Sequence, residues 1–167
     1  MSAPLHGLLL AGGKSRRMGS DKADLVINGP LSLRDRGLQL LDGVTEATYL
    51  SVAQDDERSY NSCTIRDLRP DAGPLAGLEA AFRNAPESAW LVTACDLPFL
   101  TQEVLQQLCE SRDPECEATC FTSRFDSQPE PLCAIYEPGA AASLKRALDS
   151  GVGCAESKPA LHPTSAH

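Results

Sequence analysis

The sequence LLLAGGKSRRMGSDK, residues 8–22, runs from an apolar segment into two glycines and then into four basic side chains. These bases, Lys14, Arg16, Arg17 and Lys22, stand close together in a chain whose net charge is −8. Paired glycines after a strand let backbone N–H groups approach an anion with no Cβ in the way. Arginine adds forked donors, and lysine adds a compact positive charge. The stretch therefore predicts a strand followed by a loop that binds a polyphosphate.

Two common phosphate-binding patterns do not fit this glycine-rich basic loop. The Walker loop and the dinucleotide fingerprint each require a fixed spacing of glycines, and residues 8–22 have neither spacing. A simpler interpretation is a glycine-rich turn with a solvated basic edge. A lone pair of glycines would favour that turn, whereas fifteen residues in this order favour an anion-binding loop.

The bulk composition is typical of an ordinary folded chain. Its 167 residues fit one domain with a full core, and 42% of them are apolar and 23% charged. Apolar runs are far shorter than a bilayer span, and the first residues show no pattern of a secretion signal. A pI of about 4.8 argues against general affinity for nucleic acid. We expect a cytoplasmic protein that binds neither a membrane nor nucleic acid.

The cysteines are predicted to be reduced thiols that mostly pack in the core. Their number is odd and no secretion signal precedes them, which argues against a disulfide framework. Cys116 and Cys120 suggest a zinc site, but no C-x-x-C occurs and the histidines lie near the ends of the chain. In apolar runs cysteine behaves as a small hydrophobic residue. The seven are Cys63, Cys95, Cys109, Cys116, Cys120, Cys133 and Cys154.

Apolar runs separated by turn residues predict an α/β fold. Strands are expected over residues 5–10, 48–53, 64–67, 89–94, 118–122 and 132–136. Four helices are expected. The first follows a Ser32 cap and ends near Gly43, and the second begins at Pro74. The third covers residues 101–111, and the fourth follows Gly139. Strands that alternate with helices imply a mostly parallel sheet with helices on both faces. Residues 1–150 should form this single domain, with 151–167 as a loose tail.

Polar residues fall where the predicted parallel strands end, which is where ligands bind in open α/β sheets. The glycine pair follows the first strand, Ser51 lies near the end of the second, and Asp67 ends the third. Asp96 comes two residues after the end of the strand 89–94. Because these ends meet at one edge of the sheet, we expect the four positions to share a cleft.

Asp96 is the candidate metal ligand of the sequence. Proteins usually hold Mg²⁺ with one or two carboxylates together with substrate phosphates and water. The alternative is an aspartate that caps the next turn through nearby backbone N–H groups. The upstream basic loop favours the metal site.

Asp67 and the segment GPLAG, residues 73–77, form a second candidate group. A helix that starts with small residues admits a flat nucleobase, and a carboxylate accepts hydrogen bonds from ribose hydroxyls or from the N–H edge of guanine. Taken alone, GPLAG indicates a helix N-terminus and nothing more.

Three motifs together resemble the molybdenum cofactor guanylyltransferases. They are LAGGKSRRMGSDK at 10–22, GPLAGL at 73–78 and CDLPFL at 95–100, and they occur in the order and approximate spacing of that family. QPEPL at 128–132 is similar to the family's late substrate-loop region. The likeness covers residues 5 to about 150. It implies a Rossmann-like sheet, GTP and Mg²⁺ as ligands, molybdopterin as phosphate acceptor, and transient contacts with cofactor-assembly proteins.

The resemblance also implies which residues carry the function. Arg17, Lys22 and Asp96 would be catalytic, since two cations offset phosphate charge and the carboxylate holds Mg²⁺. Positioning and charge neutralisation would dominate over covalent chemistry. Nucleotide contacts are implied at Leu10, Ala11, Gly12, Gly13, Lys22, Ser51, Asp67, Gly73, Gly77 and Asp96.

One part of the family pattern is missing from the chain. The family usually closes with an Asn-rich N-x-N-T-P-E-D segment, and residues 151–167 do not resemble it. Two alternatives therefore stand beside transfer of GMP from GTP to molybdopterin. One is a related nucleotidyltransferase with another acceptor or with CTP as donor. The other is a non-catalytic nucleotide-binding protein of cofactor assembly.

Overall fold

The computed structural model describes residues 2–11, 26, 29–69, 73–95, 97, 100–122 and 127–150. Strands and helices alternate along most of this part of the chain, as the sequence predicts. In chain order they are β1 (Leu5–Leu10), α1 (Leu33–Asp42), β2 (Ala47–Val52), β3 (Thr64–Arg66), α2 (Pro74–Asn84), β4 (Ala89–Ala94), α3 (Gln102–Glu110), β5 (Ala118–Thr122), β6 (Pro129–Tyr136) and α4 (Ala140–Asp149).

The strands form one sheet in the order β3-β2-β1-β4-β6-β5. The four strands from β3 to β4 are parallel to one another, and β6 is antiparallel to both of its neighbours. Leu10 pairs with Ser51 of β2 and with Ala94 of β4, so these three strands end level. The mostly parallel sheet predicted from the sequence is confirmed.

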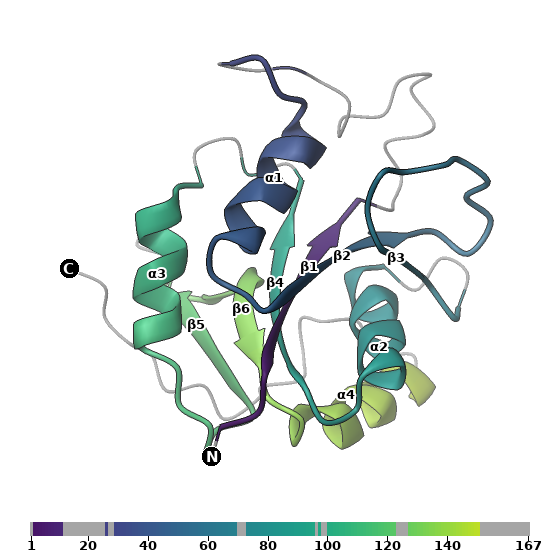
Figure 1. Cartoon of the computed structure of the whole chain (residues 1–167). Coiled ribbons are helices and arrows are strands. Elements are labelled where there is room, and N and C mark those ends of the chain that lie inside the picture. The colour runs from purple at the N-terminus through teal and green to yellow at the C-terminus, as the bar shows by residue number, and fades with distance from the viewer. Residues whose placement is uncertain are drawn as a thin grey trace.

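Helices cover both faces of the sheet, with α1 and α3 on one face and α2 and α4 on the other (Figure 1). The core between the sheet and α1 and α3 includes Leu41 of α1 and Leu105 of α3. The opposite core packs Phe82 of α2, Leu144 of α4 and the fully buried Trp90 of β4 together. The central strands are buried on both faces, which explains their continuous apolar sequences.

Local sequence signals set the starts of the helices. The Ser32 side chain accepts a hydrogen bond from the backbone N–H of Asp35 and caps α1. Pro74 occupies the first turn of α2, where its missing N–H is of no consequence. Thr101 caps α3 in the way that Ser32 caps α1. These helix starts agree with the prediction.

The last strand differs from the prediction. It was expected over residues 132–136, but β6 begins three residues earlier, at Pro129. Pairing with β4 covers only Cys133 to Tyr136, whereas Pro129 pairs with Thr122 of β5. The prolines thus lie where β6 has no partner on the β4 side, and a missing N–H costs little there. The predicted start of this strand was therefore three residues late.

Cysteine placement confirms the packing prediction for the strand residues. Cys95, Cys120 and Cys133 are buried, and burial raises the pKa of the Cys133 thiol to about 12. Cys63 is exposed, and the Cys116 thiol donates to a carboxylate oxygen of Asp113. In the described part of the chain, no helix is long and apolar enough to cross a membrane.

Candidate functional site

The candidate site lies at the carboxyl edge of the parallel strands. In the sheet, β2 and β3 lie on one side of β1, and β4, which comes later in the chain, lies on the other side. The switch point of the sheet therefore falls between β1 and β4. In open α/β sheets, the crevice outside the strand ends at such a point is where ligands bind.

Backbone hydrogen bonds fix the end of β1 between its two neighbours. The N–H of Ala11 donates to the carbonyl of Ser51 over 3.1 Å. The carbonyl of Leu10 accepts from the N–H of Cys95 over 3.3 Å. Leu10, at the end of β1, and Cys95, the residue before Asp96, are therefore joined directly, so the described residues that lead into both motifs lie at the switch point.

Ser51 and Asp67 form a hydrogen-bonded pair at this edge. The Ser51 hydroxyl donates to Oδ1 of Asp67 over 3.3 Å, and Ser51 is only 3% exposed. The N–H of Asp67 donates to the carbonyl of Val52, which holds the residue beside β2. Burial raises the pKa of Asp67 to about 6, and the Ser51 hydrogen bond opposes this rise. A carboxyl group with a perturbed pKa at the ligand-binding edge of a parallel sheet is a candidate functional group.

The first turn of α2 packs directly on this pair. A Cβ on Gly77 would lie 2.5 Å from the Ser51 Oγ and 2.9 Å from a Leu10 methyl carbon. Gly77 is therefore a close-approach glycine, and four of the expected nucleotide contacts, Leu10, Ser51, Asp67 and Gly77, form one cluster. Gly73 differs, because its φ of 67° is a conformation that side chains disfavour.

Ser51 is expected from the resemblance to contact the nucleotide, and its contacts in the structure are with other protein groups. Its hydroxyl is directed to Asp67, and Gly77 lies against it. The arrangement suits a residue that orients the Asp67 carboxylate. The other expected site residues, Gly12, Gly13, Arg17, Lys22 and Asp96, lie outside the described residues.

The segment after β2 folds around a buried carboxylate that the sequence analysis did not single out. Asp56 is 3% exposed and accepts hydrogen bonds from Arg58 and from the Tyr60 hydroxyl. Arg34, in the first turn of α1, lies with its guanidinium carbon 5.1 Å from the centre of the Tyr60 ring. This group joins the β2–β3 connection to α1. No periodicity in the sequence marks it, because its contacts involve a loop.

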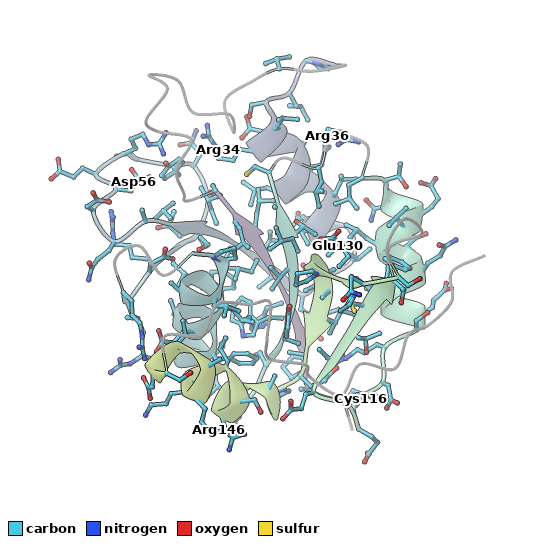
Figure 2. All side chains as sticks on the ribbon, turned by 180° about the vertical axis from the view of Figure 1, so that it is seen from behind. Arg34, Arg36, Asp56, Cys116, Glu130 and Arg146 are labelled. Atoms are coloured by element: carbon cyan, nitrogen blue, oxygen red, sulfur yellow. The ribbon has the colours of Figure 1, made fainter. Side chains whose placement is uncertain are left out.

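A second contact that the sequence did not reveal ties α1 to the segment after β4. The Arg36 guanidinium donates to the carbonyl of Leu100 over 2.6 Å. Figure 2 shows Arg34, Arg36 and Asp56 at one end of the molecule and Cys116 and Arg146 at the other. The candidate site and the Cys116 thiol are therefore at opposite ends.

Comparisons with known proteins agree with this geometry. The family model of the MobA-like NTP transferase domain matches residues 7–158. The molybdenum cofactor guanylyltransferase of Xanthomonas euvesicatoria is 33% identical, over 89% of this chain and 71% of that protein. The molybdenum cofactor biosynthesis bifunctional protein of Synechocystis is 32% identical over 90% of this chain. The chain spans only 44% of the length of that relative.

A solved structure gives the same assignment from the fold. The molybdopterin-guanine dinucleotide biosynthesis protein A of Archaeoglobus fulgidus has a TM-score of 0.70 and 30% sequence identity. The match covers 88% of this chain and 74% of that one. The family model spans the sheet, the glycine-rich basic loop and the cluster around Asp67, so the chain belongs to the MobA-like NTP transferase family.

Proposed function

We propose that the protein transfers GMP from GTP to molybdopterin, giving the guanine dinucleotide cofactor and pyrophosphate. The single observation that carries the proposal is the cluster of Leu10, Ser51, Asp67 and Gly77 at the carboxyl edge of the parallel strands, in a chain of this family. The names of the Xanthomonas and Archaeoglobus relatives support the guanylyl donor and the molybdopterin acceptor.

The nucleoside part of GTP is proposed to bind beside Asp67 and the start of α2. Among the described residues, Asp67 accepts a side-chain hydrogen bond at Oδ1, from Ser51, and none at Oδ2, so Oδ2 is the oxygen proposed to contact the ligand. A Cβ added at Gly73 would meet no atom of the described residues within 4 Å, which suits the close approach of a flat base, whereas Gly77 keeps α2 close to β2. Asp67 accepts hydrogen bonds from a guanine N–H edge or from ribose hydroxyls most effectively when it is ionised.

The triphosphate is proposed to bind the glycine-rich basic loop, with Arg17 and Lys22 offsetting its charge. A phosphate oxygen of molybdopterin forms a bond to the α-phosphorus of GTP. The bond from that phosphorus to the bridging oxygen breaks, and pyrophosphate leaves. A phosphate monoester is already largely ionised near neutral pH, so no general base is assigned. The work of the protein is to align the reactants.

Mg²⁺ is the metal we propose, with Asp96 as its protein ligand. The described edge suits a cation, because Ser51 holds the partly buried carboxylate of Asp67 there, and a cation nearby favours the ionised form of such a group. When bound, Mg²⁺ neutralises phosphate charge and orients the phosphates.

A pyrophosphate-release assay tests the proposal. Mg²⁺ is present throughout, and GTP, ATP and CTP are compared with and without molybdopterin. We expect release that requires both GTP and molybdopterin. Release with CTP, or with a sugar 1-phosphate in place of molybdopterin, would show a sister transferase. Binding of GTP without release would show a nucleotide-binding protein.

The variants Asp96→Asn and Lys22→Ala test the assigned roles in the same assay. Asp96→Asn keeps the shape of the side chain but removes the charge that binds a hard cation, so turnover should collapse while folding survives. Lys22→Ala should weaken triphosphate binding. Arg83→Ala, at an exposed position in the last turn of α2, is the control. Unchanged turnover in either site variant contradicts its assigned role.

A further inference from the structure

Arg69 connects the segment after Asp67 to two helices on the same face of the sheet. Its Nε lies 2.9 Å from Oε2 of Glu79, and its Nη2 lies 2.9 Å from Oε1 of the same carboxylate. Nη2 also donates to Oδ1 of Asp149 over 2.7 Å. Glu79 belongs to α2 and Asp149 is the last residue of α4, so one guanidinium binds a loop and two helices together.

The two residues before Arg69 are fixed as well. The N–H of Asp67 donates to the carbonyl of Val52 over 3.0 Å. The carbonyl of Leu68 accepts from the side-chain amide of Gln54 over 3.3 Å. Three consecutive residues are therefore held by separate parts of the fold, and the first of them carries the carboxylate at the candidate site.

We propose that Arg69 is a positioning residue for the nucleoside end of GTP. By fixing the backbone two residues after Asp67 to the helix that begins at GPLAG, it sets the distance between the Asp67 carboxylate and the first turn of α2. The inference rests on the proposed function, since it concerns the same site. Arg69 acts through Asp67, and it belongs to a different segment of the sequence from the basic loop that is proposed to bind the phosphates.

The exposure of the charged groups argues for a positioning role rather than for a large role in stability. Arg69 is 33% exposed, Glu79 18% and Asp149 53%. Ion pairs this close to solvent contribute little to folding stability. The hydrogen bonds to Glu79, followed by those to Asp149, raise the pKa of Arg69, so the guanidinium keeps its charge. A planar fork that contacts two carboxylates specifies geometry in a way that a lysine cannot.

The experiment compares Arg69→Met with Arg83→Met in the full chain. Methionine keeps an unbranched stem and removes the guanidinium, and Arg83 is an exposed arginine of the same helix that Arg69 contacts. Affinities for GTP and for inorganic tripolyphosphate are measured by calorimetry with Mg²⁺ and no acceptor. Steady-state kinetics then separate kcat from the KM for GTP.

We expect Arg69→Met to weaken GTP binding roughly tenfold, as the loss of a residue that orients a ligand group does. Tripolyphosphate affinity, kcat and the melting temperature should match those of Arg83→Met. Equal weakening of both probes would show general loosening and overturn the inference. Unchanged GTP affinity would also overturn it. A wild-type chain without affinity for GTP would instead overturn the proposed function.

A double-mutant cycle with Glu79→Gln tests whether the loss of GTP affinity in Arg69→Met depends on the ion pair between Arg69 and Glu79. If Arg69 acts by holding α2, the losses in GTP affinity from Arg69→Met and Glu79→Gln should not add. Arg69→Lys should recover only part of the affinity, because a lysine holds one carboxylate at a time. Additive losses, or full recovery by lysine, would contradict the proposed geometry.

Discussion

The environment of Asp67 disfavours the ionised form of its carboxyl group. Its carboxyl group is partly buried, and burial raises its pKa from 3.8 to about 6. Ser51 supplies one compensating hydrogen bond. A group kept in such a place at a cost in stability is a sign of function, because selection for folding alone would replace it.

Replacing Asp67 by asparagine should stabilise the nucleotide-free protein above pH 6. A raised carboxyl pKa means that the folded state binds more protons than the unfolded state between about pH 4 and pH 6, so stability falls as pH rises through that window. Asp67→Asn removes this loss, with a gain of about 1–2 kcal/mol at pH 7.5 after allowance for solvent screening. Denaturant unfolding at pH 7.5 and pH 4 measures it.

The same variant should lose GTP affinity, so stability and binding move in opposite directions. The gain in stability should be absent at pH 4, where the wild-type carboxyl group is already protonated in the folded state. Asp35→Asn, at the exposed start of α1, serves as the control. A variant that is less stable at pH 7.5 would contradict the unfavourable burial of Asp67.

Ser51→Ala should raise the pKa of Asp67 further. The hydroxyl donates to the ionised carboxylate and so favours it, and its removal leaves burial unopposed. We expect the carboxyl carbon of Asp67 to titrate above pH 6 in an NMR titration. As the pH is lowered, GTP affinity should begin to decline at a higher pH in this variant than in the wild type. Ser143→Ala, whose hydroxyl donates to Glu117, is the control. An unchanged or lower Asp67 pKa would show that the hydrogen bond is unimportant.

At the scale of elements, the close contact between α2 and β2 depends on Gly77. Alanine has the higher helix propensity, so Gly77→Ala would stabilise an isolated helix. Here the added Cβ would lie 2.5 Å from the Ser51 Oγ, and α2 must shift away from the strand end. We expect a loss of about 1–3 kcal/mol of folding stability, as for overpacked sites, together with weaker GTP binding.

The double variant Ser51→Ala with Gly77→Ala separates this contact from other effects. Removing the Oγ relieves the shortest contact and leaves the Ser51 Cβ at 3.4 Å, so part of the lost stability should return. Denaturant unfolding of the single and double variants measures the recovery. Strictly additive losses would show that the added methyl group meets other obstacles, such as the Leu10 methyl carbon at 2.9 Å.

At the scale of the whole molecule, the described part of the chain already holds two apolar cores, one on each face of the sheet. Within the described residues, the last element that contributes to them is α4, which ends at Asp149. The composition of residues 151–167 predicts a loose tail. Deleting 151–167 should therefore change neither the melting temperature nor GTP affinity. Thermal unfolding and calorimetry check this, and a loss of turnover alone would mean that the segment closes the site.

The order of elements could be predicted because it depends on neighbours in the chain. The run 89–94 is a strand at the predicted residues, and Ser32, Pro74 and Thr101 start helices as expected. Each signal requires only a few adjacent residues to be apolar or to cap a helix. The prediction failed for the start of β6, because whether a proline disrupts a strand depends on which partner strand lies beside it.

The meeting of Leu10, Ser51 and Asp67 at the strand ends could be predicted from the sequence, because residues at the ends of apolar runs meet at one edge of a parallel sheet. The contacts within the site did not follow. Ser51 faces Asp67 sixteen residues away, and Arg69 reaches Asp149 eighty residues away. Such pairs arise only when the packing of strands and helices brings distant segments together. Local apolar patterns thus specified the sheet and its helices, whereas tertiary packing specified which groups orient the carboxylate.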